Sequence, residues 1–221
     1  MPGPIARRSL QDEATDWLRQ EILHGRLAPS ATLTETALSQ RMGVGRGTVR
    51  SALFALEAAE LVGRLPYSRW HVVPLDAAVI AEVYTLRGAL EELAARLFAA
   101  RPDRGLLHPA FARLAEAETG DAEARLAADL GYHRAVVEAS GHGHLIRSHR
   151  ALSDKVEWLY RWSELHWPQR TRLVDDHRAL HAALAGGTPE AAVAATRAHI
   201  ATSLQQDLDG FAALAGLSKE A

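Results

Sequence analysis

Apolar residues in the first third of the chain follow short helical periods separated by turn signals. A helix is predicted over residues 9–24, where apolar side chains recur every three or four positions. These side chains are Leu10, Ala14, Trp17, Leu18 and Ile22. Thr34 is a good N-cap for a second, short helix, and a third helix is predicted over residues 46–59. Between them, Gly43-Val44-Gly45 can form a tight turn, because glycine permits positive φ.

Two short apolar stretches, residues 61–65 and 70–73, follow the third helix. They flank Pro66-Tyr67-Ser68-Arg69, which has the composition of a turn, so a β-hairpin is predicted here. Three helices with a glycine turn before the third, followed by a hairpin, are typical of a winged helix-turn-helix.

The rest of the chain carries only helical patterns. Pro74-Leu75-Asp76 marks a boundary, and Asp76 can cap the helix that follows. One apolar stripe of this helix is predicted to face the core: Val79, Val83, Leu86, Leu90, Leu93 and Leu97. Further helices are predicted over residues 109–119, 121–139, 143–165, 169–185 and 189–215.

The expected fold is therefore mainly α. We expect a mobile tail at residues 1–8, a winged helix-turn-helix with a small hairpin wing at residues 9–75, and an all-α antiparallel helical bundle at residues 76–217.

Composition and charge are consistent with two domains. The chain has 221 residues and no cysteine, which excludes disulfides and thiolate metal sites. It has neither a signal peptide nor an apolar run near the roughly 18 residues that a membrane span needs, so a cytoplasmic location is expected. Residues 1–75 hold 9 Arg and 7 Asp/Glu, a charge of +2, whereas the remainder holds 16 Lys/Arg and 20 Asp/Glu, a charge of −4. This difference in sign suits an N-terminal domain that binds DNA.

The third predicted helix carries the candidate DNA contacts. Arg46 and Arg50 lie one turn apart near its start, where a recognition helix meets base edges and phosphates. Gly47, Thr48 and Ser51 can also face outward. The alternative is that these residues are only the solvated face of a small helical domain.

Four residues of the C-terminal part have the chemistry of a metal site. Asp129 and His133 are four positions apart on one predicted helix, so their side chains share a face. His177 lies in the apolar stripe of a later helix, and His199 lies on the last helix. One carboxylate and three imidazoles could bind a divalent transition metal such as zinc, nickel or manganese. Alternatively, each histidine is a hydrogen-bonded core residue, and His181, one turn after His177, is a competing candidate ligand.

Residues 18–62 resemble the N-terminal DNA-binding domain of the GntR family along their whole length. The resemblance rests on an ordered set of positions that includes Leu18-Arg19, Gly25, Pro29, Glu35, Gly43-Val44, Arg46, Val49-Arg50, Leu56-Glu57 and Leu61-Val62. It implies a winged helix-turn-helix in which Arg46, Thr48 and Arg50 contact DNA.

The chain departs from the family pattern at three places. Ser30 stands where glycine usually follows proline, and Gly45 and Gly47 replace a Ser/Thr pair around the first recognition arginine. The wing tip, where the family commonly has glycine, reads Tyr67-Ser68-Arg69.

Residues 84–100, 127–141 and 175–200 are similar to the FCD ligand-binding domain of the FadR subfamily. In the metal-binding members of that domain, the ligands are the Asp and His of a D-x3-H motif, the His that begins an H-R-x-L segment, and a His near the end of the last helix. The resemblance therefore implies a metal site formed by four residues of this chain: Asp129, His133, His177 and His199.

The same resemblance implies that Arg87 points into an effector cavity, where its guanidinium would bind a carboxylate. The alternative for Arg87 is an exposed position, paired with Glu91 one turn later. Arg134 and Arg150 are further candidates for the cavity.

These features predict a metabolite-responsive transcriptional regulator rather than an enzyme. We expect a homodimer that binds an inverted-repeat operator in double-stranded DNA and responds to a small carboxylate metabolite held between the metal and Arg87. A metal-ion sensor and a metalloenzyme are the alternatives. The enzyme would lack an H-E-x-x-H motif and would leave the helix-turn-helix unexplained.

Overall fold

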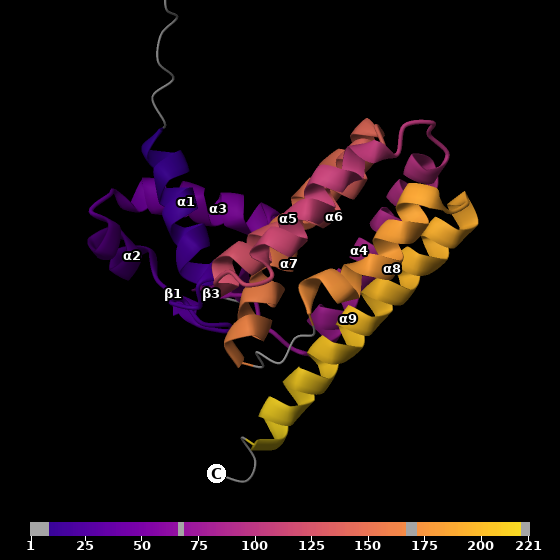
Figure 1. Ribbon diagram of the computed structural model, residues 1–221. Coiled ribbons are helices and arrows are strands. Elements are labelled where there is room, and N and C mark those ends of the chain that lie inside the picture. The colour runs from indigo at the N-terminus through magenta and orange to yellow at the C-terminus, as the bar shows by residue number, and fades with distance from the viewer. Residues whose placement is uncertain (1–8, 66–68, 167–171, 218–221) are drawn as a thin grey trace, which may run out of the picture. The chain divides into compact units, whose positions relative to one another are not determined.

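The computed structural model describes residues 9–65, 69–166 and 172–217, and the chain divides into two compact units, residues 1–75 and 76–221 (Figure 1). The predicted tail at residues 1–8 and the predicted wing-tip residues Tyr67 and Ser68 lie outside the described residues. The first unit contains α1 (Leu10–Leu23), β1 (Thr32–Leu33), α2 (Glu35–Met42), α3 (Arg46–Ala58), β2 (Val62–Leu65) and β3 (Arg69–Val72).

The helices of the first unit pack around a small apolar core. Leu18 and Ile22 of α1 and Val49 and Leu53 of α3 are all completely buried. Helix α2 begins where the sequence predicts, because the hydroxyl of Thr34 accepts a hydrogen bond from the Ala37 N–H at 3.3 Å. The turn between α2 and α3 contains Gly43 at φ 66°, the left-handed region that favours glycine. The predicted helix-turn-helix is confirmed.

The wing is part of a three-stranded antiparallel sheet with strand order β1-β3-β2. Strands β2 and β3 form the predicted hairpin, with Val62 opposite Val72 and Arg64 opposite Trp70. Strand β1 was not predicted, because two residues carry no measurable periodicity. Ser30, just before β1, adopts φ 63°, which agrees with its place at a position where the family has glycine.

The second unit is an antiparallel bundle of helices, as the sequence predicts. Its elements are α4 (Ala77–Ala99), the 3-10 helix η1 (Gly105–Leu107), α5 (His108–Ala117), α6 (Ala122–Ala139), α7 (Gly143–His166), α8 (Leu173–Gly186) and α9 (Pro189–Leu217). Helix α4 lies along α9 and also contacts α6 and α7 (Figure 1). No strand occurs among the described residues of this unit, and none of the described helices is long and apolar enough to cross a membrane.

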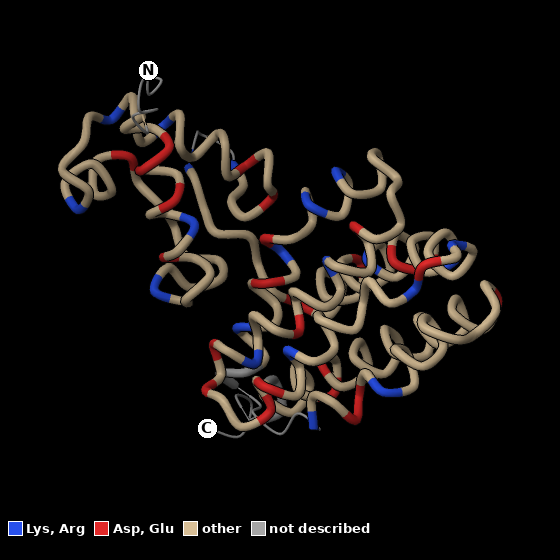
Figure 2. The backbone as a smooth tube through the Cα atoms, turned by 45° about the horizontal axis from the view of Figure 1, so that its top comes forward, with Lys and Arg blue, Asp and Glu red and all other residues tan. Residues whose placement is uncertain are grey.

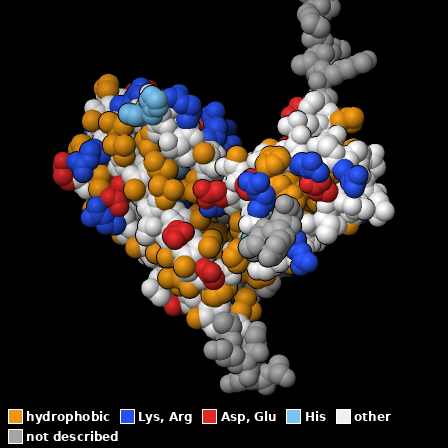
Figure 3. All heavy atoms as spheres, turned by 180° about the vertical axis from the view of Figure 1, so that it is seen from behind, with side chains coloured by type: hydrophobic (Ala, Val, Ile, Leu, Met, Phe, Trp, Pro, Cys, Tyr) orange, Lys and Arg blue, Asp and Glu red, His pale blue; other side chains and the backbone are white. Residues whose placement is uncertain are grey.

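The predicted core stripe of α4 is confirmed for Val83, which is buried, and for Leu90 and Leu97, which pack against the core, but it is wrong for two of its leucines. Leu86 and Leu93 are 52% and 42% exposed. The buried face instead carries Arg87 and Glu91, each 1% exposed, together with small residues such as Gly88. A Cβ at Gly88 would lie 3.4 Å from the Ile200 side chain, so glycine lets α9 approach closely. Leu86 and Leu93 therefore leave hydrophobic side chains exposed on the outer face of α4. Figure 3, which views the molecule from behind, shows hydrophobic side chains gathered on this unit.

Candidate functional site

The candidate DNA contacts lie on the first two turns of α3. Arg46, Gly47 and Arg50 are exposed, and Thr48 and Ser51 are partly exposed. Arg46 donates no hydrogen bond to any other described residue. The structure therefore places all five predicted positions on accessible backbone or side chains at the start of the recognition helix.

Arg50 differs from Arg46 because it forms an ion pair with Glu35 of α2. The Nε and Nη2 atoms of Arg50 donate to the two carboxylate oxygens of Glu35 at 2.8 and 2.7 Å. This hydrogen-bonded ion pair lowers the pKa of the Glu35 carboxyl. Basic and acidic residues are interspersed along the backbone of this unit (Figure 2).

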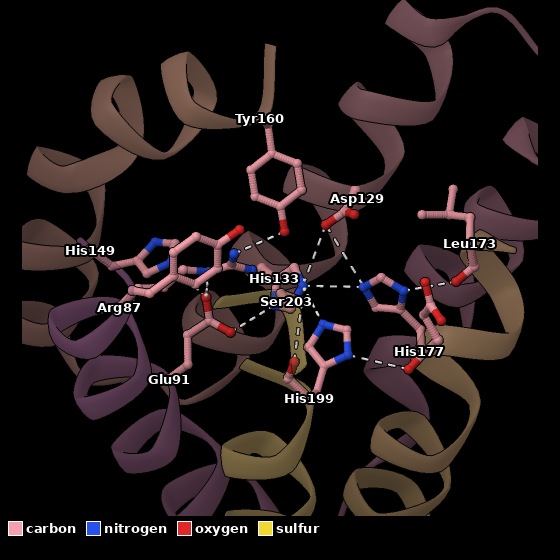
Figure 4. A network of polar contacts seen from close by, with 12 residues as sticks. Arg87, Glu91, Asp129, His133, His149, Tyr160, Leu173, His177, His199 and Ser203 are labelled. Carbon is pink, nitrogen blue, oxygen red and sulfur yellow. Dashed lines mark hydrogen bonds and ion pairs between the residues drawn. The ribbon is translucent and has the colours of Figure 1, made fainter. Parts of the chain in front are cut away.

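The four predicted metal ligands come together in the interior of the second unit (Figure 4). The Nε2 atom of His133 on α6 lies 3.2 Å from Nε2 of His177 on α8 and 3.3 Å from Nε2 of His199 on α9. Oδ1 of Asp129 lies 3.4 Å from Nε2 of His133 and 3.8 Å from Nε2 of His177. His133 and His177 are 2% and 1% exposed, whereas His199 is only partly buried, so the cluster is accessible from the side of His199.

Each of the three imidazoles is oriented by an acceptor at its other nitrogen. Nδ1 of His133 lies 2.6 Å from Oε2 of Glu91, and Nδ1 of His177 lies 2.8 Å from the Leu173 carbonyl oxygen. Nδ1 of His199 lies 3.2 Å from the carbonyl oxygen of Asp176. These oxygens can only accept, so each Nδ1 donates, and in a neutral ring the Nε2 atom then turns a lone pair toward the centre.

The geometry and charge of the cluster fit a divalent cation. Burial, and then the neighbouring imidazoles, lower the pKa of His199 to about 3, and burial likewise lowers the pKa of His133. Both rings are therefore neutral and able to bind a metal. At a metal–nitrogen distance of about 2.0–2.1 Å, two ligand nitrogens lie roughly 3.0–3.4 Å apart, and the observed separations fall in this range.

Arg87 and Glu91 support the cluster from α4. Nε of Arg87 donates to Oε1 of Glu91 at 2.6 Å, and Nη1 donates to the Tyr160 hydroxyl at 2.9 Å. Glu91 therefore accepts from Arg87 with one oxygen and from His133 with the other (Figure 4). The guanidinium holds the pKa of the Glu91 carboxyl well below its usual range although burial opposes this.

The cluster opens into a cavity of about 30 Å³, which is room for an ion and about one water molecule. Its lining includes Arg125, Asp129, Tyr160, His177, His199 and Ser203. A groove of about 220 Å³ between α8 and α9 continues from it and shares His199, Ser203 and Gln206 with the cavity.

Comparison with known proteins shows to which family the chain belongs. The model of the bacterial regulatory proteins of the gntR family matches residues 10–72, and the FCD domain model matches residues 82–202. The chain is 30% identical to the probable D-xylose utilization operon transcriptional repressor of Paenarthrobacter nicotinovorans, over 90% of this chain and 89% of that protein. The chain belongs to the GntR family.

Two further similarities agree with a GntR regulator that carries an FCD domain. An HTH-type transcriptional regulator of Mycobacterium tuberculosis is 29% identical over 90% of each chain. The crystal structure of a GntR transcriptional regulator from Rhodococcus sp. RHA1 shares the fold with a TM-score of 0.73, at 23% identity over 91% of this chain and 99% of that chain. Because these relatives are transcriptional regulators, the GntR protein described here is a regulator rather than an enzyme.

The structure separates the three predicted effector arginines. Arg87 is buried beside the cluster, and its ion pair with Glu91 is buried rather than exposed. Arg134 is exposed on α6, and Arg150 is exposed and pairs with Glu138 at 3.2 Å. Neither lines the cavity, because both side chains point to solvent from the outer faces of their helices.

His181, the competing ligand, lies apart from the cluster. Its ring stacks on Phe111 at 4.1 Å and lies within hydrogen-bonding distance, 3.2 Å, of both His108 and the Tyr132 hydroxyl. Glu91 and Arg125 are residues of this site that the sequence did not reveal. For Glu91, the spacing of four from Arg87 was visible, but the burial that turns this pair toward His133 was not.

The buried Arg87–Glu91 pair gives the first prediction. Arg87→Met removes the cation and leaves the Glu91 carboxylate buried, so we expect the free energy of unfolding of the C-terminal unit to fall by about 3–5 kcal/mol. Metal affinity should fall by about 10- to 100-fold, because Glu91 then holds His133 less rigidly. Urea unfolding and competition with a metal chelator measure the two effects.

Arg197→Met is the matched control, because Arg197 forms an exposed ion pair with Glu92, the neighbour of Glu91. It should change neither quantity appreciably. The double variant Arg87→Met/Glu91→Met should regain stability but not metal affinity. Wild-type stability in Arg87→Met would contradict this account of the pair.

Proposed function

We propose that this regulator controls its operator affinity through a small carboxylate that binds at a divalent metal held by Asp129, His133, His177 and His199. The observation that carries the proposal is the convergence of three imidazole Nε2 atoms: those of His177 and His199 lie 3.2 and 3.3 Å from that of His133. Three lone pairs directed at one buried point repel one another unless a cation lies between them.

The donor set limits the choice of metal. Three nitrogens and one carboxylate oxygen, without sulfur, suit zinc, nickel or manganese. A bound ion of this kind would supply Lewis acidity and open coordination positions that accept a carboxylate. The residues named above would hold it, and Glu91 would keep the His133 ring in its orientation.

The carboxylate is proposed to approach from the cavity side that carries Arg125. Among the described residues that line the cavity, Arg125 is the single Lys or Arg. It is half-buried and lies one turn before Asp129 on α6, with Nη1 bound to the Glu118 carbonyl at 2.9 Å. Arg87 contributes indirectly, through its hydrogen bond to the Tyr160 hydroxyl, because its charge is already balanced by Glu91. A divalent metal with one Asp ligand, together with Arg125 and with Asp176, which also lines the cavity, leaves one net positive charge that an anion would neutralise.

A homodimer bound to an inverted repeat completes the proposal. Two recognition helices related by a two-fold axis would match a palindromic operator, with contacts from Arg46, Gly47, Thr48, Arg50 and Ser51. The exposed leucines of α4, Leu86 and Leu93, support an apolar contact between two copies. Sedimentation equilibrium should give about twice the mass of the 24.0 kDa chain, and a monomer at micromolar concentration would exclude this assembly.

The small volume of the cavity favours a second candidate, a metal-ion sensor. A cavity of about 30 Å³ holds an ion but no metabolite unless the ligand also occupies the groove between α8 and α9. In a sensor, metal alone would change operator affinity, and carboxylates would have no further effect at saturating metal.

The metal site itself is tested with His177→Ala. Loss of one of three imidazoles should abolish the bound metal in protein purified without added metal, as measured by elemental analysis. The melting temperature should fall to that of chelator-treated wild type, because a ligand that binds only the folded state stabilises it. His181→Ala, one turn away and outside the cluster, should retain metal. A full metal complement in His177→Ala would refute the ligand set.

The effector response is tested with Arg125→Gln. Wild-type protein, saturated with metal, is screened against small mono- and dicarboxylic acids for a change in operator affinity. We expect a shift of about 5- to 150-fold with the cognate acid, and a much smaller shift in Arg125→Gln. Arg134→Gln removes an exposed charge of the same helix and should respond like wild type. If the acid changed operator affinity equally in all three proteins, Arg125 would not bind the carboxylate.

A further inference from the structure

Glu35 places a negative charge on the side of the first unit that carries the candidate DNA contacts. It stands at the first position of α2, and its carboxylate reaches Arg50 on the exposed side of the recognition helix. Arg46 also acts on it electrostatically. A carboxylate on a surface that approaches DNA phosphates weakens binding to every sequence, because like charges repel. Glu35 therefore works against simple charge attraction at the DNA-binding face.

The contact also restricts which part of Arg50 can meet DNA. A guanidinium offers five N–H donors in one plane, in two edges that can each bind an acceptor pair. Glu35 occupies the edge formed by Nε and Nη2, at 2.8 and 2.7 Å. The edge formed by Nη1 and Nη2 remains, and it is accessible because the Arg50 side chain is 58% exposed. Arg50 therefore presents a single edge, in an orientation that α2 fixes.

We propose that Glu35 is a specificity-determining positioning residue: by holding one edge of Arg50, it limits this arginine to DNA contacts in one orientation and penalises all others. The proposal rests on the DNA contact by Arg50 proposed above. It gives α2 a role in discrimination between DNA sequences, because Glu35, which orients Arg50, belongs to the helix before the recognition helix.

Two measurable consequences follow from the charge of the pair. The Arg50–Glu35 pair is nearly neutral as a whole, so it adds little to the counterion release that drives non-specific binding. Removal of the Glu35 charge frees Arg50 to follow any nearby phosphate. Non-specific affinity then rises while the advantage of the correct sequence falls, because the orienting contact is lost.

The test uses full-length protein and two DNA probes. One probe is a 30-base-pair duplex selected by the wild-type protein from a random library, and the other is sheared salmon-sperm DNA. Dissociation constants are measured for wild type, Glu35→Gln, Glu35→Asp and Arg50→Ala at a series of NaCl concentrations. Glu57→Gln is the matched control, because it removes an equal charge from an exposed Glu–Arg pair of the same unit, Glu57 with Arg64 at 2.8 Å.

In Glu35→Gln, we expect binding to salmon-sperm DNA to tighten and its dependence on log[NaCl] to steepen by about 0.9 per subunit. The ratio of selected to non-specific affinity should fall by about fivefold or more. Glu35→Asp keeps the charge but loses reach, so its ratio should lie between those of wild type and Glu35→Gln. Because Glu35→Asp is measured independently, the proposal remains testable even if Glu35→Gln folds poorly.

Three results would overturn the proposal. In the first, Glu35→Gln leaves the ratio of selected to non-specific affinity and the salt dependence unchanged, while Arg50→Ala weakens binding of the selected duplex. Arg50 would then contact DNA without any positioning role for Glu35. In the second, Glu57→Gln and Glu35→Gln change the affinity ratio and the salt dependence equally. The change would then come from the net charge of the protein and not from the orientation of Arg50. Wild-type binding of the selected duplex by Arg50→Ala would remove the Arg50 contact itself, and with it the basis of this inference.

Discussion

The meeting of three imidazole nitrogens at one buried point is the constraint on which the C-terminal unit depends. Nε2 atoms of His133, His177 and His199 approach one another closely, and each ring is locked by an acceptor at Nδ1. Uncompensated lone pairs at this distance in a protein interior are unfavourable. The packing of α6, α8 and α9 thus creates a point that a cation would stabilise, and a bound ion would in turn stabilise the folded unit.

This constraint also accounts for the orientation of α4. Glu91 must face inward to accept from His133, and a buried carboxylate requires a counter-ion, which Arg87 provides. With both polar residues turned inward, the leucines at positions 86 and 93 turn outward. The exposed leucines on the outer face of α4 thus accompany the buried Arg87–Glu91 pair on its inner face.

The sequence reveals the parts of the fold that depend on local signals. Cap residues such as Thr34 and Asp76, and the glycine turn at Gly43, define the starts and ends of helices correctly, because these signals act within a few residues. The spacing of Asp129 and His133 places two ligands on one face for the same reason. The burial of Arg87 and Glu91 on α4 could not be predicted, since it depends on contacts with α6 and α7 that are distant in sequence. The positions of Arg134 and Arg150 likewise depend on which face of each helix meets the bundle.

Both units use a carboxylate to fix a cationic or nitrogen-bearing side chain that has a proposed function. Glu35 orients Arg50 in the first unit, and Glu91 orients His133 in the second.

The central claim, that the imidazole cluster is a metal site, is tested most directly by anomalous X-ray diffraction from crystals of protein purified without added metal. We predict one strong peak per chain, about 2.0–2.3 Å from Nε2 of each of the three histidines. The absence of a peak at this point, or a peak elsewhere in the chain, would contradict the account.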